Sequence, residues 1–369
     1  MGDIMTCSLC HTELTAYNQH SIDNEYLCIN CYEDNTDSCS CCGERIWNDD
    51  NAGSRDTPLC ESCYDQHYTT CSRCGFIITH DEVCNCEDND DPYCHDCYVS
   101  YEKCNYIHSY NYKPSPIFYG EDIRFFGVEI EIDNGGKSQD NAESLVNIAN
   151  AVNDHVYIKS DSSLDDGLEI VTHPMSLKYH INSMPWSQVL KHSIGLGYRS
   201  HETSTCGLHI HVNRSCFTDN FAYQEECIAR VLYLVERFWE ELLRFSRRTQ
   251  SQLKRWANRY GYKERPEDIL DSAKRDYGGR YTCVNLTNRN TIEFRIFRGT
   301  LKYNTFIATL QLVNEICDVA FSISDEEIRD LSWCGFMERI SHEQYPELVQ
   351  YLKERRLYIN EPITCEAEV

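Results

Sequence analysis

Residues 124–133 read Arg-Phe-Phe-Gly-Val-Glu-Ile-Glu-Ile-Asp, a stretch in which apolar and acidic residues alternate. A period of two is typical of a half-buried β-strand. The valine and the two isoleucines would face a core, while Glu129 and Glu131 would lie on the opposite face, about 6–7 Å apart along the strand. Two carboxylates held this way repel each other unless a cation neutralises them. The stretch therefore predicts a strand whose polar face is either solvated or part of a divalent metal site.

Three later segments have the same two-faced character. Residues 168–172 carry a glutamate, and residues 205–213 carry two histidines with one residue between them. Residues 291–301 carry a glutamate and, two positions later, an arginine. Each strand alone could belong to a sheet with one solvated face. Together they place acids, imidazoles and a guanidinium on the polar face of a mainly antiparallel sheet: Glu129, Glu131, Glu169, His209, His211, Glu293 and Arg295.

Amphipathic helices are expected to cover the apolar face of this sheet, which gives an α+β fold. Helical periodicity predicts them over residues 142–152, 175–196 with a break at Pro185, 221–258 and 304–321, followed by a helical tail at 325–358 and a frayed end. The 221–258 segment has a basic end, residues 244–255. This end is either a solvated face or a surface that holds an anionic substrate.

Cys-x-x-Cys pairs recur along the first hundred residues, and the leading pair returns every 32 residues, at positions 7, 39 and 71. One such turn presents two sulfurs to a zinc ion, and a second turn completes the tetrahedron. Units this short bury too little apolar surface to fold without the metal. The spacing predicts three structural zinc units over residues 7–31, 39–63 and 71–104, with a layout like treble-clef or LIM fingers. Their ligands would be Cys7, Cys10, Cys28, Cys31, Cys39, Cys42, Cys60, Cys63, Cys71, Cys74, Cys94 and Cys97.

Four cysteines of the same region stand outside these pairs: Cys41, Cys84, Cys86 and Cys104. Their spacing leaves open whether some of them form a further metal site with a histidine or whether they are free thiols.

Charge and cysteine content divide the chain into two regions. Sixteen of the 23 cysteines precede Lys113, as does most of the acidic excess of a chain with net charge −25. A Pro-containing linker at residues 112–116 then separates a zinc-finger region, 1–113, from a second domain, 114–369.

The acidity argues against nucleic acid or an anionic membrane as partner, so the fingers are expected to dock onto a protein. Neither a long apolar run nor a secretory signal is visible, and a cytoplasmic location with metal thiolates rather than disulfides is expected.

The polar strands carry motifs in a particular order: Phe-Gly-Val-Glu-Ile-Glu at 126–131, Gly-Leu-Glu-Ile-Val-Thr at 167–172, Gly-Leu-His-Ile-His-Val at 207–212 and Thr-Ile-Glu-Phe-Arg-Ile-Phe-Arg-Gly at 291–299. This order resembles the amidoligase family, and the likeness covers about residues 126–321. It implies the catalytic fold of glutamine synthetase and glutamate–cysteine ligase. It also implies ATP-dependent ligation of a carboxylate to an amine through an acyl phosphate, with ATP and Mg²⁺ as cofactors, in a phage or bacterial protein.

The resemblance implies roles for individual residues. The expected magnesium ligands, of which Glu169 would also lie near the acid substrate, are Glu129, Glu131, Glu169, His209 and Glu293. His211 matches a nucleotide contact and Arg295 a phosphate-neutralising arginine, with Arg280 and Arg298 as further phosphate candidates. The base that deprotonates the amine stays open among Asp161, Asp165 and Asp166, and so does the role of Asn285.

Two other functions stay open. The chain could be a zinc-finger adaptor whose ligase-like scaffold has lost activity. It could also be a metal-dependent hydrolase that activates water with the same carboxylates and histidines. The arginine two residues after Glu293 favours phosphate handling over hydrolysis.

Overall fold

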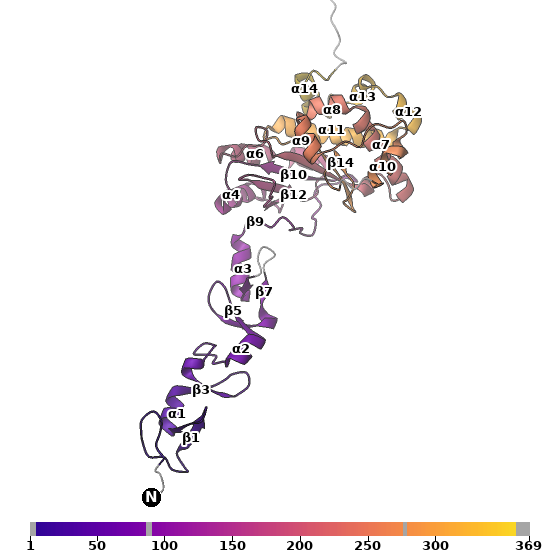
Figure 1. Cartoon of the computed structure of the whole chain (residues 1–369). Coiled ribbons are helices and arrows are strands. Elements are labelled where there is room, and N and C mark those ends of the chain that lie inside the picture. The colour runs from indigo at the N-terminus through magenta and orange to yellow at the C-terminus, as the bar shows by residue number, and fades with distance from the viewer. Residues whose placement is uncertain (1–4, 86–90, 276–278, 359–369) are drawn as a thin grey trace, which may run out of the picture. The chain divides into compact units, whose positions relative to one another are not determined.

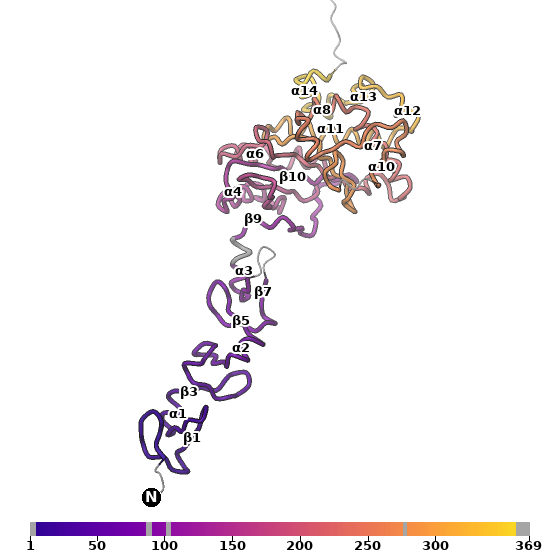
Figure 2. Tube along the Cα trace, viewed as in Figure 1, coloured from indigo at the N-terminus to yellow at the C-terminus, as the bar shows by residue number. Residues whose placement is uncertain are grey.

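The computed structural model describes residues 5–85, 91–275 and 279–358 and divides the chain into two compact units, residues 1–104 and 105–369 (Figure 1). The path of the chain within each unit can be followed in Figure 2. Cys86 and the tail after Tyr358 lie outside the described residues, as does the side chain of Cys104. Within the described part, no helix is both long and apolar enough to cross a membrane.

The first unit repeats one small design three times, in which short antiparallel strands precede a helix. The elements are β1 Gln19–Ile22, β2 Glu25–Cys28 and α1 Ile29–Asn35; β3 Thr36–Ser38, β4 Arg45–Trp47 and α2 Glu61–His67; then β5 Tyr68–Thr70, β6 Ile77–Thr79, β7 Cys84–Asn85, β8 Pro92–Tyr93 and α3 His95–Cys104. Each repeat buries only a few side chains, such as Leu27 in the first and Leu59 in the second, and these pack against cysteines. Cores this small are typical of units that a bound metal stabilises.

The second unit is built on a seven-stranded mixed sheet with the order β14-β15-β13-β10-β12-β11-β9. All neighbouring strands are antiparallel except β9 and β11. The strands are β9 Ile107–His108, β10 Phe126–Ile132, β11 Val156–Lys159, β12 Leu168–Thr172, β13 Gly207–Asn213, β14 Val284–Asn285 and β15 Thr291–Arg298. The predicted α+β class is confirmed.

Strand β9 changes where the first unit ends. It hydrogen-bonds in parallel to β11, with Ile107 opposite Ile158. Residues 105–113 therefore belong with the sheet, and the two units divide at Cys104, before the expected boundary at Lys113.

Helices pack around the sheet. They are α4 Gln139–Ala149, α5 Leu177–Asn182, α6 Trp186–Gly195, α7 Phe221–Arg237, α8 Trp239–Ser246, α9 Gln250–Trp256, α10 Pro266–Arg275, α11 Tyr303–Ser322, α12 Asp325–Asp330, α13 Trp333–Arg339 and α14 Pro346–Glu354. The prediction of one long helix at 221–258 is wrong, because the segment forms α7, α8 and α9. Helix α8 ends where Arg247 takes a left-handed conformation with φ of 60°, which stops helix propagation.

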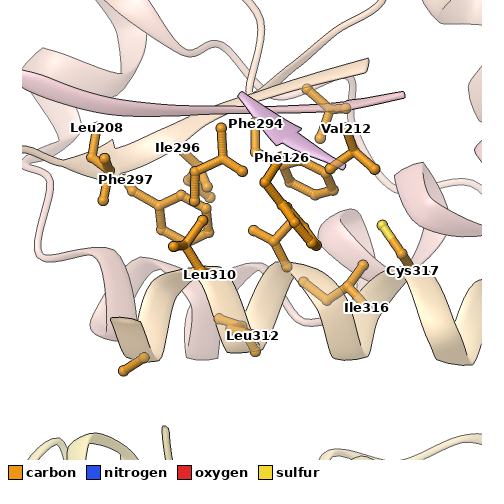
Figure 3. Packing of buried hydrophobic residues seen from close by; sticks show 14 of the residues in the cluster. Phe126, Leu208, Val212, Phe294, Ile296, Phe297, Leu310, Leu312, Ile316 and Cys317 are labelled. Carbon is orange, nitrogen blue, oxygen red and sulfur yellow. The ribbon is translucent and has the colours of Figure 1, made fainter. Parts of the chain in front are cut away.

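The apolar face of the sheet packs against α11 (Figure 3). Phe126, Leu208 and Phe294 from three neighbouring strands are fully buried, as are Leu310 and Leu312 of the helix. Because strand side chains alternate, this packing fixes the acidic and imidazole side chains on the other face.

One irregularity interrupts the ladder between β13 and β15. Leu208 pairs with Phe297, but Ile210 pairs with Phe294, so β15 has one more residue than β13 between these pairs. This is a β-bulge opposite His209.

Candidate active site

The polar residues of the central strands meet through the sheet register. Glu129 of β10 is opposite His209 of β13, and Glu131 of the same strand is opposite Glu169 of β12. His211 of β13 is in turn opposite Glu293 of β15. Sequence-distant strands thus bring these side chains to one patch of the sheet, as the alternation predicted.

The two histidines lie among carboxylates. His209 Nδ1 is 3.3 Å from Glu129 Oε2 and 3.9 Å from Glu293 Oε1, and its Nε2 is 3.8 Å from Glu131 Oε1. His211 Nε2 is 3.2 Å from Glu129 Oε1 and 4.0 Å from Glu293 Oε1. Glu129 therefore lies at the centre of the cluster and contacts both imidazoles.

Two groups of three ligand atoms that share Glu129 could each hold a metal ion: Glu129 with Glu169 and His209, and Glu129 with His211 and Glu293. Within each group the atoms lie within 4.8 Å of one another. The donor set, carboxylate oxygen and imidazole nitrogen, suits a divalent cation. His209 Nε2 is buried without a hydrogen-bond partner, and its contact with Glu131 Oε1 is 3.8 Å long, which is costly unless a ligand completes the site. The residues present therefore fit one or two cations that share Glu129.

Burial and neighbouring charges shift the pKa values of three glutamates in this cluster. Burial by itself would raise the pKa of Glu129, but His211 and His209 hold it well below its usual value. For Glu293, burial is likewise outweighed by His211 and Arg295, and its pKa is lowered. Burial and the charge of Glu129 raise the pKa of Glu169 well above its usual value. Without a cation, protons and imidazolium groups must balance these carboxylates.

Two arginines add positive charge beside the carboxylates. Arg295 Nη1 donates to Glu293 Oε1, and Glu293 Oε2 also accepts from Asn285 Nδ2 at 2.7 Å. Arg248 is buried, donates from Nη1 to the Arg295 carbonyl at 2.8 Å and has an unpartnered Nε. The interpretation of Arg248 as part of a solvated face is therefore wrong, and it is available to an anion.

Gly207 provides the space for this arrangement. A Cβ at this position would lie 2.4 Å from Arg248 Nη2 and 2.7 Å from His209 Nε2. Its backbone N–H donates to Glu131 Oε2. The glycine therefore permits the arginine, the imidazole and the carboxylate to meet at the strand.

The cluster lies in a cavity of about 520 Å³. Of the predicted residues, this cavity is lined by Glu129, Glu131, Glu169, His209, His211, Glu293, Arg295, Arg280, Asn285 and Asp161. Arg298 is not among them, and it donates instead to the carbonyl oxygens of Arg247 at 3.3 Å and Thr203 at 3.4 Å. Asp165 and Asp166 are also absent from the lining, which leaves Asp161 as the loop carboxylate inside the cavity.

Further lining residues were not predicted as site residues: Tyr110, Asn111, Lys113, Lys159, Arg248, Arg255, Trp256 and Tyr281. The first three had been assigned to the finger region and its linker. Lys159 ends β11 on the polar face, and its Nζ is 3.4 Å from Glu169 Oε2. Its place beside the motif glutamates was readable from the alternation of residues 156–159.

Comparison with protein families adds to this geometry. A family model described as "Putative amidoligase enzyme" matches residues 149–317, a segment that holds β11 to β15. This segment is similar to the putative amidoligase family. The predicted resemblance is confirmed over residues 149–317, a range that does not include the first predicted motif at 126–131, and the family model indicates an amidoligase enzyme. No curated protein matches the chain.

The three cysteine groups lie outside the amidoligase segment. In each, the four sulfur atoms lie within 4.8 Å of one another, with the composition predicted from the spacing. Sγ–Sγ distances are 3.6 Å for Cys10 and Cys28, 3.9 Å for Cys42 and Cys60, and 3.8 Å for Cys74 and Cys94. A tetrahedron with Zn–S bonds of about 2.3 Å has edges of about 3.8 Å, so these groups fit structural zinc. Cys41 and Cys84 are not members of the three groups.

Proposed function

We propose that the protein is an ATP-dependent carboxylate–amine ligase that forms an amide or isopeptide bond through an acyl phosphate. The observation that carries the proposal is the pair of ligand groups sharing Glu129, next to Arg295 and Arg248, in one cavity. Most residues that line this cavity belong to the segment that is similar to amidoligases, and Glu129 is contributed by the preceding strand β10. The sheet with an acidic and imidazole face is also consistent with a glutamine synthetase-like catalytic fold.

The chemistry requires positive charge where phosphate is transferred. The carboxylate of the acid attacks the γ-phosphorus of ATP and releases ADP, and the amine then displaces phosphate from the acyl carbon. Magnesium, when bound, would neutralise the phosphate oxygens. Glu129, Glu131, Glu169, His209 and Glu293 are its proposed ligands. His211, which belongs to the second ligand group, would also contact the nucleotide.

The arginines contribute directly to the first step. Arg295 and Arg248 lie on the cavity wall, and their guanidinium groups would stabilise charge that grows on the γ-phosphoryl oxygens. Arg280 also lines the cavity, and its side chain is exposed.

Asp161 is the proposed base for the second step. Its Oδ1 accepts from the Ser163 backbone N–H at 2.6 Å, which orients the carboxylate at the cavity. It would accept the proton that the amine loses as the carbon–nitrogen bond forms.

The first unit is proposed as a docking module for a protein partner. Its clusters of four cysteines offer closed coordination, which is structural rather than catalytic. The acidic composition of the region is better suited to a protein surface than to nucleic acid or an anionic membrane. A cytoplasmic location in a phage or bacterial setting remains our expectation.

The test measures ADP release by the full-length, zinc-loaded protein with Mg²⁺, ATP and a panel of carboxylic acids, with and without hydroxylamine. Hydroxylamine is a small amine that converts an acyl phosphate to a detectable hydroxamate. We expect amine-dependent ADP and hydroxamate in equal amounts for at least one acid. An inactive adaptor would release no ADP, and a hydrolase would turn over substrate without ATP or amine.

A further inference from the structure

Cations and aromatic rings alternate along one part of the cavity lining. We call Lys113, Lys159, Arg255 and Arg280 the cationic rim; all four line the cavity. The Tyr110 ring contacts two of them, with Lys159 Nζ 5.0 Å and Arg280 Cζ 5.2 Å from its centre.

The same alternation continues on the other side of Arg280. Arg280 Cζ is 5.1 Å from the centre of the Tyr281 ring. The Tyr281 and Trp256 rings pack edge to face, with 5.7 Å between their centres. Arg255 Cζ is 4.5 Å from the Trp256 ring. Cation–π contacts hold the charged groups in place without neutralising them.

The cationic rim is short of negative partners. Lys159 pairs with Glu169, but none of the ion pairs among the described residues involves Lys113, Arg255 or Arg280, all of which are exposed. The chain as a whole has 59 acidic against 34 basic residues. Unpaired cations gathered at one cavity of so acidic a protein indicate that an anionic ligand supplies the missing charge.

Charge also indicates which substrate the cationic rim receives. The amine is protonated before it reacts, so the rim repels it, and a polyamine or a lysine-rich peptide is disfavoured as its occupant. The nucleotide phosphates have their own partners in the carboxylate cluster with its cations and in Arg295 and Arg248. The rim is therefore left for the part of the acid substrate that does not react.

We propose that the acid substrate is a polycarboxylate, in its simplest form an acidic peptide segment. Its additional carboxylates bind the cationic rim while one carboxylate reaches the proposed magnesium ligands. This inference rests on the proposed ligase function and adds the chemical class of the acid. Arginine suits this role because its planar guanidinium can bind a carboxylate through two hydrogen bonds.

The experiment measures binding by calorimetry, not turnover. Full-length, zinc-loaded protein with Mg²⁺ and a non-hydrolysable ATP analogue is titrated with N-acetyl-tetraglutamate and with N-acetyl-tetraglutamine, which has the same size and a free C-terminal carboxylate. We expect the acidic peptide to bind at least tenfold more tightly. Arg280→Gln and Lys113→Gln should each weaken it about tenfold, the size of one charge-assisted contact.

The matched control is Arg265→Gln. Arg265 is exposed and pairs with Asp268 at 2.8 Å, and it does not line the cavity, so peptide binding should not change. Equal affinity for the two peptides, absence of binding by both, or a loss confined to the ATP analogue in Arg280→Gln would each overturn the proposal. If wild-type protein fails to bind the ATP analogue with Mg²⁺, the ligase function itself is refuted instead.

Discussion

The substitution Glu129→Gln tests the site most directly, because Glu129 belongs to both ligand groups while Glu293 belongs to one. Gln has the same shape as Glu but carries no charge. Losing one stabilising group at a transition state costs about 10²–10³ in rate. Two affected cations then predict a loss of about 10⁴ in turnover for Glu129→Gln, or about 5 kcal/mol at 1.36 kcal/mol per tenfold. Glu293→Gln should lose only about 10².

The same argument predicts how many ions bind. Mn²⁺ is a spectroscopic substitute for Mg²⁺, and electron paramagnetic resonance can count the ions bound in the presence of the ATP analogue. We expect two ions for the wild type, one for Glu293→Gln and fewer than one for Glu129→Gln, since the two groups share Glu129. This count does not depend on knowing the acid or the amine.

Glu267→Gln is the control for both measurements. Glu267 is on the surface of α10 and pairs with Arg265 at 3.1 Å, away from the cavity lining. Its rate and ion count should equal those of the wild type, and circular dichroism should be alike in all variants. Near-native turnover, or two bound ions, in a folded Glu129→Gln protein would show that Glu129 does not join the two groups.

Three further predictions concern the zinc content, the stability of the core and its pH dependence. Cys39→Ser should lower the zinc content measured by mass spectrometry from three ions per chain to two, because Cys39 belongs to one of three separate groups; an unchanged content would contradict the cluster. Leu310→Ala removes a fully buried side chain from the sheet–helix core and should cost about 3 kcal/mol in urea unfolding followed by tryptophan fluorescence, whereas less than 1 kcal/mol would argue against that packing. Burial lowers the pKa of His180 to about 4, and its neutral ring accepts from Trp186 Nε1 at Nδ1 and lies 3.0 Å from the Phe126 carbonyl at Nε2. The pKa of a histidine in the unfolded chain is about 6.5, so the contribution of neutral His180 to the free energy of unfolding is complete above that pH and falls by about 2 kcal/mol by pH 5. His180→Gln should remove this part of the pH dependence of stability. Identical pH profiles for the variant and the wild type would refute the burial of a neutral His180.

The sequence predicted those parts of the site that depend on strand alternation. The side chains of Glu129, His209 and Glu293 meet because each lies opposite a buried apolar face, and that pattern is local. Tyr110 and Lys113 could not be found in this way, since the short strand β9 that precedes them is defined only by its distant partner β11.

The basic stretch before α9 was ambiguous for a similar reason. Charge alone does not distinguish Arg248, which is buried in the cavity wall, from an arginine in solvent. The left-handed conformation of Arg247 turns the chain at this point, and neither residue type nor helical period indicated it. Arg298 is likewise held by this turn, because its Nη1 donates to the Arg247 carbonyl oxygen.

The bulge in β15 has a consequence for how this strand tolerates changes in length. The extra residue allows Ile296 and Phe297 to follow each other in the sequence and still both be buried. Deleting Ile296 would restore a regular ladder, with Arg295 alone opposite His209 and Phe297 still opposite Leu208, at the loss of one buried side chain. Deleting Arg295 would instead place Ile296 opposite His209 on the polar face, so the residue that is lost decides whether the strand accommodates the shorter length.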